Sequence, residues 1–184
     1  MTIKEIINST ASVVGRKDVV EYLENGRESS SDTLDTVNKM VSLLNMIIGE
    51  LAGTFIPLVK TEDIRVNDGK IYFKDLSFQP LEILDVYEGD NPVKFVHYPE
   101  YIKVNGTSVK VVYSCIPPVY DINSNIDYSE TDISKTAFIY GLCAEYCICS
   151  GAFDEAVLWH DRYVSCIKET RKLKNSKIKG RYWE

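Results

Sequence analysis

Three cysteines close together in the last third of the chain are the first residues with a possible chemistry. Cys143, Cys147 and Cys149 form the pattern CxxxCxC, and cysteine thiolates bind zinc and other soft metals. On a helix Cys143 and Cys147 share a face while Cys149 points elsewhere, and no CxxC pair or second pair of ligands accompanies them. We therefore interpret them as buried thiols that pack like small apolar side chains, and we expect neither a metal nor a cofactor.

The two histidines offer little for catalysis. His160-Asp161 matches the doublet of metal phosphohydrolases, but those sites need further histidines, and this chain has only His97 besides. A nucleophile pair of Cys115 and His97 lacks any feature that would activate the thiolate. We therefore predict that His160 is a core or hydrogen-bonded histidine. Because the sequence also has no P-loop, GxSxG or dinucleotide fingerprint, we predict that the protein is not an enzyme.

The apolar periodicity places helices at both ends of the chain and strands in the middle. A helical period runs over residues 2–52, with a break near Gly15, and again over 132–174, where Gly151 separates the two arms of an antiparallel hairpin. Residues 55–115 instead alternate with a period of two. The predicted fold is α+β: a helical bundle with an inserted small antiparallel β-sheet, forming one domain over residues 1–174.

Two turn signals lie within the β segment. Asn67-Asp68-Gly69 and Asn105-Gly106 tolerate the positive φ angles that tight hairpin turns require. The predicted hairpins join 63–66 to 70–73 and 101–104 to 108–113, and further strands at 84–87 and 93–98 add to the same sheet.

The helix predicted up to residue 52 has an apolar seam at heptad spacing, which includes Leu34, Val37, Val41, Leu44 and Ile48. The seam lasts under three heptads, too short for a free-standing coiled coil. Two interpretations stay open: the seam is buried within one core, or the helix also packs on a neighbouring subunit. In the last helix, Trp159 and Tyr163 share one row, and a second row beside it contains Val157, His160, Val164 and Ile167.

Size, composition and charge limit the classes of protein. A chain of 184 residues with 45% apolar residues builds one sizeable core. The N-terminus has no signal-peptide pattern, five cysteines are an odd number, and the longest apolar run is broken at Asn45 and Glu50. We therefore expect a soluble protein with reduced thiols and no contact with a membrane.

The charge is divided unevenly along the chain. Residues 1–161 carry 13 Lys and Arg against 25 Asp and Glu, a net charge of −12, whereas residues 162–184 carry 8 against 2, a net charge of +6. An acidic body argues against a broad duplex-binding surface, because such binding needs clustered basic residues to neutralise phosphates. The basic end, predicted as an extended tail over 175–184, contains Lys177, Lys179, Arg181, Tyr182 and Trp183. It is either a solvated tail or a docking peptide that folds onto a partner.

The segment KTAFIYGLCAEYCICSGAFDEAVLWHDRYVSCIKETRK, together with this order of elements, resembles the head-tail connector proteins of tailed bacteriophages, also called adaptor or neck proteins. Their paired helices carry patterns of the kinds A-x-x-Y-x-x-A and E-A-x-x-W-x-x-x-Y. The matching residues are Ala137, Tyr140, Ala144, Glu155, Ala156, Trp159 and Tyr163. The predicted sheet is larger than in the all-helical members and closer to those of short-tailed phages, which leaves the tail type open.

The resemblance implies a structural protein of the virion neck. Such proteins form a homo-oligomeric ring, commonly of twelve subunits, between the portal protein and the tail proteins, and genomic DNA passes through it without sequence-specific binding. The basic and aromatic residues of the tail would dock on the portal, and the heptad seam with Trp159 and Tyr163 would pack between subunits. An acidic lumen would repel DNA phosphates and let the duplex slide. The alternative is a monomeric regulatory or binding protein that uses the tail on nucleic acid or an acidic partner.

Overall fold

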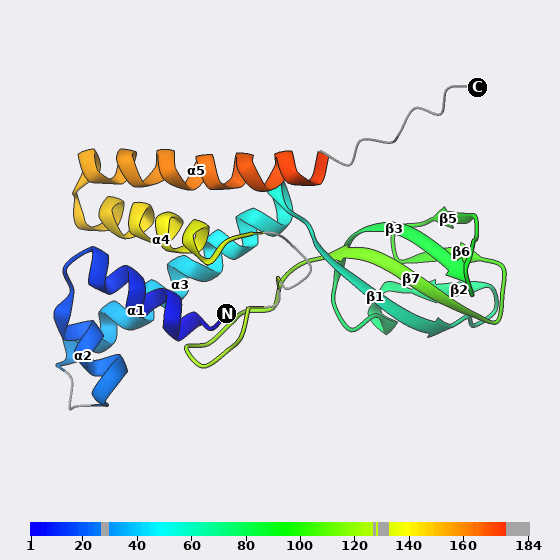
Figure 1. Ribbon diagram of the computed structural model, residues 1–184. Coiled ribbons are helices and arrows are strands. Elements are labelled where there is room, and N and C mark those ends of the chain that lie inside the picture. The colour runs from blue at the N-terminus through cyan, green and yellow to red at the C-terminus, as the bar shows by residue number, and fades with distance from the viewer. Residues whose placement is uncertain (27–29, 127, 129–132, 176–184) are drawn as a thin grey trace, which may run out of the picture. The chain divides into compact units, whose positions relative to one another are not determined.

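A computed structural model of the chain describes residues 1–26, 30–126, 128 and 133–175 (Figure 1). The fold is α+β, as predicted. The described helices are α1 (Ile3–Val13), α2 (Lys17–Asn25), α3 (Ser31–Glu50), α4 (Lys135–Ser150) and α5 (Phe153–Asn175), with a π-helical turn η1 (Leu51–Phe55) and a 3-10 turn η2 (Phe73–Asp75). The described strands are β1 (Leu58–Arg65), β2 (Lys70–Tyr72), β3 (Pro80–Glu88), β4 (Asn91–Pro92), β5 (Phe95–His97), β6 (Tyr101–Val104) and β7 (Ser108–Cys115).

The chain divides into two compact units. A helical unit comprises Met1–Ile48 and Val119–Glu184, and a sheet unit comprises Gly49–Pro118. Among the described residues, no helix combines the length and the apolar character that crossing a membrane requires.

Local capping sets the helix boundaries. The predicted break at Gly15 is confirmed, since α1 ends just before it and Gly15 has a φ of 77°. Thr2 and Glu5 form a capping box at the start of α1. The later helix begins at Lys135 rather than at 132, because the Ser134 side chain accepts a hydrogen bond from the backbone N–H of Ala137.

The core of the helical unit lies where α1, α3 and α4 meet. α4 is apolar around almost its whole circumference and therefore runs through the middle of this unit. The largest side chains that are under 2% exposed in this core include Ile3, Ile6, Ile7, Met40, Leu44, Ile47, Phe138 and Tyr128.

The segment between the sheet unit and α4 is held against the N-terminus. The backbone N–H of Ile3 donates to the carbonyl of Ser124 at 3.0 Å, and that of Ile126 donates to the carbonyl of Met1 at 3.0 Å. Ile126 and Tyr128 are buried. These contacts tie the segment that returns from the sheet unit to the start of the helical unit.

The β segment forms two antiparallel sheets, whereas the sequence predicted one. The four-stranded sheet has the order β1-β7-β3-β4, and the three-stranded sheet has the order β2-β6-β5. The strand expected at 84–87 lies within β3, and β5 occupies the middle of the strand expected at 93–98. Neither predicted pair of hairpin strands exists, because β1 pairs with β7 and β2 pairs with β6. The tight turn at Asp68-Gly69 does form, since the backbones of Asn67 and Lys70 exchange two hydrogen bonds, at 3.1 and 2.9 Å.

One long antiparallel ribbon replaces the two hairpins. Its register continues unchanged from one sheet into the other, since Arg65 pairs with Ser108 in the first ladder and Lys70 pairs with Lys103 in the second. The predicted turns lie opposite each other within this ribbon, as kinks in its two strands. A residue pair that tolerates positive φ is compatible with a kink as well as with a hairpin.

Hydrogen bonds hold the two kinks together. The backbone N–H of Val66 donates to the carbonyl of Thr107, and that of Val104 donates to the carbonyl of Gly69, each at 3.0 Å. Asp68 and Gly69 have φ angles of 51° and 71°. Both strands therefore leave the four-stranded sheet at the same level and enter the three-stranded sheet as a pair.

Candidate functional site on the helical hairpin

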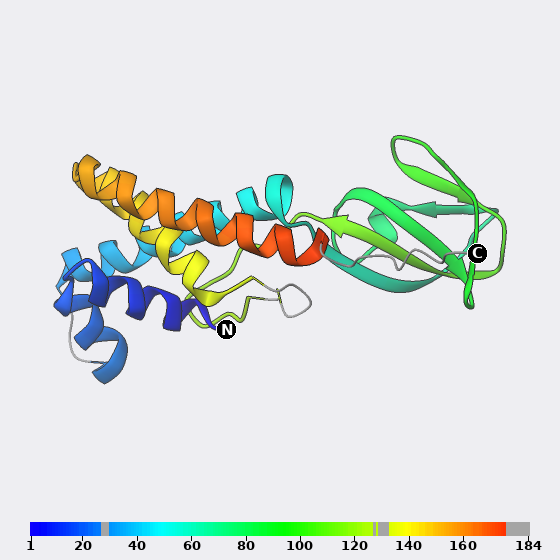
Figure 2. The ribbon, with the colours of Figure 1, turned by 45° about the horizontal axis from the view of Figure 1, so that its top comes forward.

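The residues that carry the resemblance lie on α4 and α5, which run side by side as a helical hairpin (Figure 2). The rings of Tyr140 on α4 and Trp159 on α5 lie with their centroids 5.6 Å apart. The Arg162 guanidinium lies over the Trp159 ring at 4.7 Å and over the Tyr140 ring at 5.8 Å. Such cation–π contacts fix the two aromatic side chains at the hairpin surface.

Small residues bring the helices of the hairpin close together. Ala137, Ala144 and Ala156 are each at most 4% exposed. Gly141 lies so close to α5 that a Cβ built on it would be 3.1 Å from the Tyr163 ring. Gly141 is not part of any predicted site, although a glycine inside a helix with an apolar face indicates close packing.

The seven residues predicted to pack between subunits have different environments. Val37, Leu44, Ile48 and Tyr163 are at most 5% exposed within the helical unit. Leu34 is 40% exposed, and Val41 and Trp159 are half-buried. Burial within one core therefore accounts for the four buried residues. The three partly exposed residues, Leu34, Val41 and Trp159, retain surface that a partner can contact.

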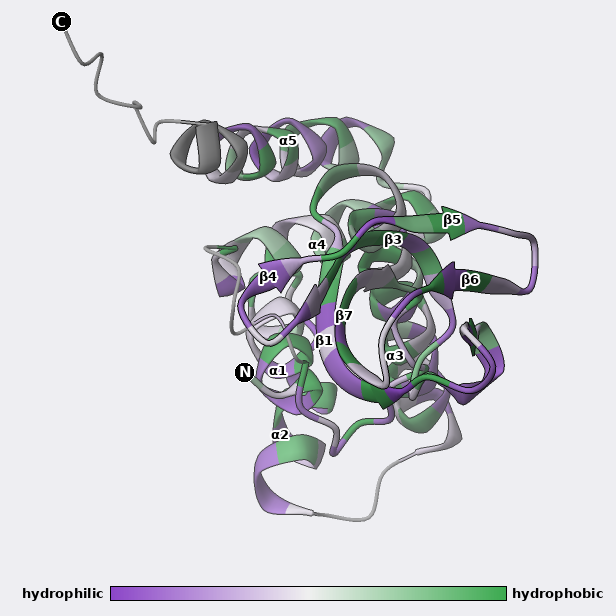
Figure 3. Cartoon of the chain, turned by 90° about the vertical axis from the view of Figure 1, so that its right-hand side faces the viewer, coloured by the Kyte–Doolittle hydropathy of each residue, from purple (hydrophilic) through white to green (hydrophobic). Residues whose placement is uncertain are grey.

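The second predicted row of α5 is exposed at its start and buried at its end, where Ile167 is 3% exposed. Val157 is 60% exposed, and Phe153, one turn before it, is 65% exposed. At 3.6 residues per turn these side chains project from the same flank as His160 and Val164, which are exposed and half-buried respectively. Figure 3 shows hydrophobic and hydrophilic residues alternating along α5. We call Phe153, Val157, His160 and Val164 the α5 flank.

The other side of α5 provides a contrast. Leu158 is 64% exposed, but it projects about 100° away from Val157 around the helix axis. The neighbouring exposed positions there include Glu155 and Arg162. Leu158 is therefore a single exposed apolar side chain, of the kind common on protein surfaces.

A partly exposed ion network around Arg16 connects α2, α3 and α4. The Arg16 guanidinium donates two hydrogen bonds to Asp18, at 2.9 and 2.8 Å, one to Asp32 at 3.0 Å and one to the Tyr146 hydroxyl at 3.0 Å. Asp18 also accepts a hydrogen bond from the Thr33 hydroxyl at 2.9 Å. The bonds from Arg16 hold the pKa of Asp18 far below its usual range, and the bond to Asp18 raises the pKa of Arg16.

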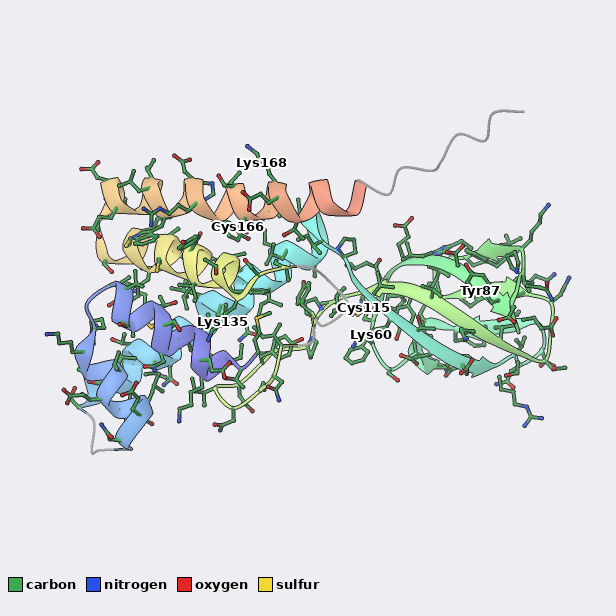
Figure 4. The ribbon with its side chains drawn as sticks, viewed as in Figure 1. Lys60, Tyr87, Cys115, Lys135, Cys166 and Lys168 are labelled. Atoms are coloured by element: carbon green, nitrogen blue, oxygen red, sulfur yellow. The ribbon has the colours of Figure 1, made fainter. Side chains whose placement is uncertain are left out.

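The prediction of buried thiols is confirmed for two of the three clustered cysteines and is wrong for Cys149. Cys143 and Cys147 are buried and Cys149 is exposed. Burial raises the pKa of Cys143 to about 12 and also raises the pKa of Cys147 and Cys166. Cys166 and Lys168 point to opposite sides of α5 (Figure 4). In the part of the chain that the structure describes, no three His, Cys, Asp or Glu residues gather as metal ligands.

Both histidines lie on the surface, which excludes the core position for His160 and leaves the hydrogen-bonded alternative. His160 is exposed and its ring lies 6.2 Å from that of Tyr163. His97 on β5 is exposed and lies 5.3 Å from the Phe73 ring, in the three-stranded sheet, whereas the buried Cys115 belongs to β7 of the other sheet. The structure thus does not bring Cys115 and His97 together in one sheet.

The predicted tail residues Lys177, Lys179, Arg181, Tyr182 and Trp183 lie outside the described residues. In comparisons with known proteins, the chain matches no protein-family model, and no curated protein sequence matches it significantly.

Proposed function

We propose that this chain is a head-tail connector protein of a tailed bacteriophage. It assembles with copies of itself into a ring, commonly of twelve subunits, between the portal and the tail, and the ring provides a conduit for genomic DNA. The proposal starts from the sequence resemblance over about residues 132–172 and from the order of the elements. It places the protein in the virion neck, with portal and tail proteins as its partners.

The observation that carries the proposal is the pair of exposed apolar side chains, Phe153 and Val157, on the α5 flank. Phe153 and Val157 are both more than half exposed, and they lie one turn apart on the helix that carries part of the resemblance. Burying one large apolar side chain contributes roughly 1.5–3 kcal/mol. A neighbouring copy that covers both side chains therefore gains free energy from burying apolar surface that is exposed in the single chain. Trp159 and Leu34 add further exposed apolar area.

Charge supports a conduit rather than a DNA-binding surface. The net charge of −12 over residues 1–161 disfavours tight contact with duplex phosphates, so a passing duplex is not retained. The basic tail has the opposite sign, and its Tyr182 and Trp183 give it the aromatic area typical of a docking peptide. In the proposed ring this tail binds the portal.

Oligomeric state tests the proposal directly. The purified chain is examined over a concentration series by light scattering and by negative-stain imaging, together with a Phe153→Ser/Val157→Ser variant and a Leu158→Ser control. We expect rings with a central hole for the wild type and the control, and smaller species for the double variant. A protein that stays monomeric at every concentration, alone and with its portal, would favour the monomeric binding protein instead.

The docking role of the tail has its own test. A chain shortened by deletion of residues 176–184 is compared with the full chain for binding to the portal protein of the same phage. We expect portal binding to be lost while the circular dichroism spectrum is unchanged. Portal binding that survives the deletion would exclude the tail as the anchor.

A further inference from the structure

Tyrosines and lysines gather on one face of the three-stranded sheet. Residues directly opposite each other in neighbouring strands point to the same face of a sheet. Tyr72 pairs with Tyr101, and Lys70 pairs with Lys103. Because each pair is separated by one residue along its strand, all four side chains share one face.

The other face of this sheet is the buried one. Ile71 and Ile102 pair with each other between those two pairs, and they are 2% and 1% exposed. The tyrosines and lysines therefore lie on the outer face. Lys103 is exposed, and Lys70, Tyr72 and Tyr101 are half-buried.

The rings form a connected aromatic surface. Tyr98, which follows β5 and is 38% exposed, stacks on Tyr101 with centroids 4.6 Å apart and an interplanar angle of 14°. The Tyr72 ring lies 5.5 Å from the Tyr101 ring at a tilt of 52°. The stack therefore ends in an exposed ring at Tyr98.

Ammonium groups lie against these rings. The Lys70 Nζ is 4.9 Å from the Tyr101 ring centroid, and the Lys74 Nζ is 5.4 Å from that of Tyr72. With Lys103, three positive charges surround the three tyrosines. We call Lys70, Tyr72, Lys74, Tyr98, Tyr101 and Lys103 the tyrosine–lysine face.

A hollow lies at one end of this face. It has a volume of about 470 Å³ and is lined by Tyr72, Phe73, Lys74, Pro99 and Glu100. Its walls are thus mainly aromatic and apolar, with one positive and one negative charge. Glu100 is exposed and is the acidic group in this lining.

We propose that the tyrosine–lysine face binds single-stranded nucleic acid without sequence preference. Proteins of this kind combine aromatic rings, on which bases stack, with positive charges that contact the backbone phosphates. A duplex hides the faces of its bases, and three lysines on an acidic chain are few for binding through phosphates alone. This binding is a function separate from ring assembly and does not rest on the proposed connector role.

Fluorescence anisotropy of the full chain with labelled oligo(dT) of about 12 nucleotides tests the proposal. We expect binding to single strands that is clearly tighter than to the matching duplex. The affinity should fall as salt rises from about 50 to about 200 mM, with a logarithmic slope near −2 for three phosphate contacts. Oligo(dA) should bind with an affinity similar to that of oligo(dT).

Three variants assign the binding to this face. Tyr98→Ala should weaken binding about fivefold or more, and Lys103→Gln should weaken it and make the salt slope shallower. Glu100→Gln should strengthen it, because it removes a negative charge beside the phosphate path. The control is Lys168→Gln, at an exposed position of α5 in the helical unit. It removes a positive charge, as Lys103→Gln does, and should leave the affinity unchanged.

The basic tail is the competing site within the same chain. Deleting residues 176–184 should leave at least the part of the binding that depends on Tyr98. The proposal is wrong if the full chain binds no oligonucleotide. It is equally wrong if the duplex binds as tightly as the single strand, or if Tyr98→Ala and Lys103→Gln leave the affinity unchanged while the tail deletion abolishes it.

Discussion

Gly141 on α4 lies directly against the Tyr163 ring on α5. A Cβ on Gly141 would be 3.1 and 3.2 Å from two ring carbons of Tyr163 and 3.3 Å from the Ile47 side chain of α3. Tyr163 and Ile47 are 4% and 2% exposed, so neither can move aside freely. At Gly141, three helices, α3, α4 and α5, therefore come into close contact.

Gly141→Ala should destabilise the helical unit. Alanine favours a helix by about 1 kcal/mol over glycine, but overpacking a tight core costs roughly 1–3 kcal/mol. We expect a net loss of about 1 kcal/mol in the free energy of unfolding, measured by urea denaturation. Gly49→Ala is the matched control, since a Cβ on Gly49 at the end of α3 meets nothing within 4 Å, and it should be neutral or stabilising. Equal stabilisation by both substitutions would contradict the tight packing at Gly141.

Asn45 holds the backbone of Tyr120 with both ends of its amide. Its Nδ2 donates to the carbonyl of Tyr120 at 2.8 Å, and its Oδ1 accepts from the N–H of Tyr120 at 2.8 Å. Asn45→Leu removes both bonds, which should lower the free energy of unfolding by roughly 2–4 kcal/mol. Ser42→Ala, which removes one exposed hydrogen bond to Asn38 within α3, should change it by at most about 0.5 kcal/mol. Similar stabilities for the two variants would show that the Asn45 bridge contributes little.

Asp18 should make the helical unit sensitive to acid. Hydrogen bonds from Arg16 are the main reason that the pKa of Asp18 is lowered. As the pH falls, the Asp18 carboxylate is therefore protonated in the unfolded chain before it is protonated in the folded chain. The stabilisation is complete above the unfolded pKa of about 3.9 and is lost as the pH falls below it. In Asp18→Asn, stability should depend less steeply on pH between about 5 and 2. Asp35→Asn on α3 is the control, and an identical slope in wild type and Asp18→Asn would rule out this role.

Cys149 should be the most reactive thiol of the native protein. It is exposed, whereas Cys143 is buried and burial raises its pKa to about 12, so little Cys143 is present as the reactive thiolate. Brief labelling with a maleimide at mildly alkaline pH, followed by peptide mass spectrometry, should modify Cys149 first and Cys143 last. Cys149→Ser should remove the fast phase. Rapid labelling of Cys143 would show that the α4–α5 core opens readily.

Part of this fold follows from local chemistry that can be read along the chain. The αL conformation of Gly151 (φ 80°) and the break at Gly15 are properties of single glycines, and the apolar pattern of α4 predicts its central position. For the same reason, the sequence identified the turn residues at 67–69 and 105–106. Helix, strand and turn preferences each depend on a few neighbouring residues.

These local signals could not predict which strands pair with each other. A turn signal specifies backbone angles, but which strand completes the ladder depends on which side chains are buried in common. The continuous pairing of β1 with β7 and of β2 with β6 buries Val111 and Ile102 in their respective sheets. The tyrosine–lysine face results from this pairing, because it places Tyr72 beside Tyr101.

The sequence by itself determined the α+β class, the helical hairpin, the uneven charge and the family resemblance. Only the tertiary structure decided that Val37, Leu44 and Ile48 of the predicted seam are buried within the single chain, that Phe153 and Val157 stay exposed, and that tyrosines about 30 residues apart share one face. The physical reason is that exposure and juxtaposition belong to the packed molecule: an apolar residue has the same helical period whether its neighbour is a core or solvent.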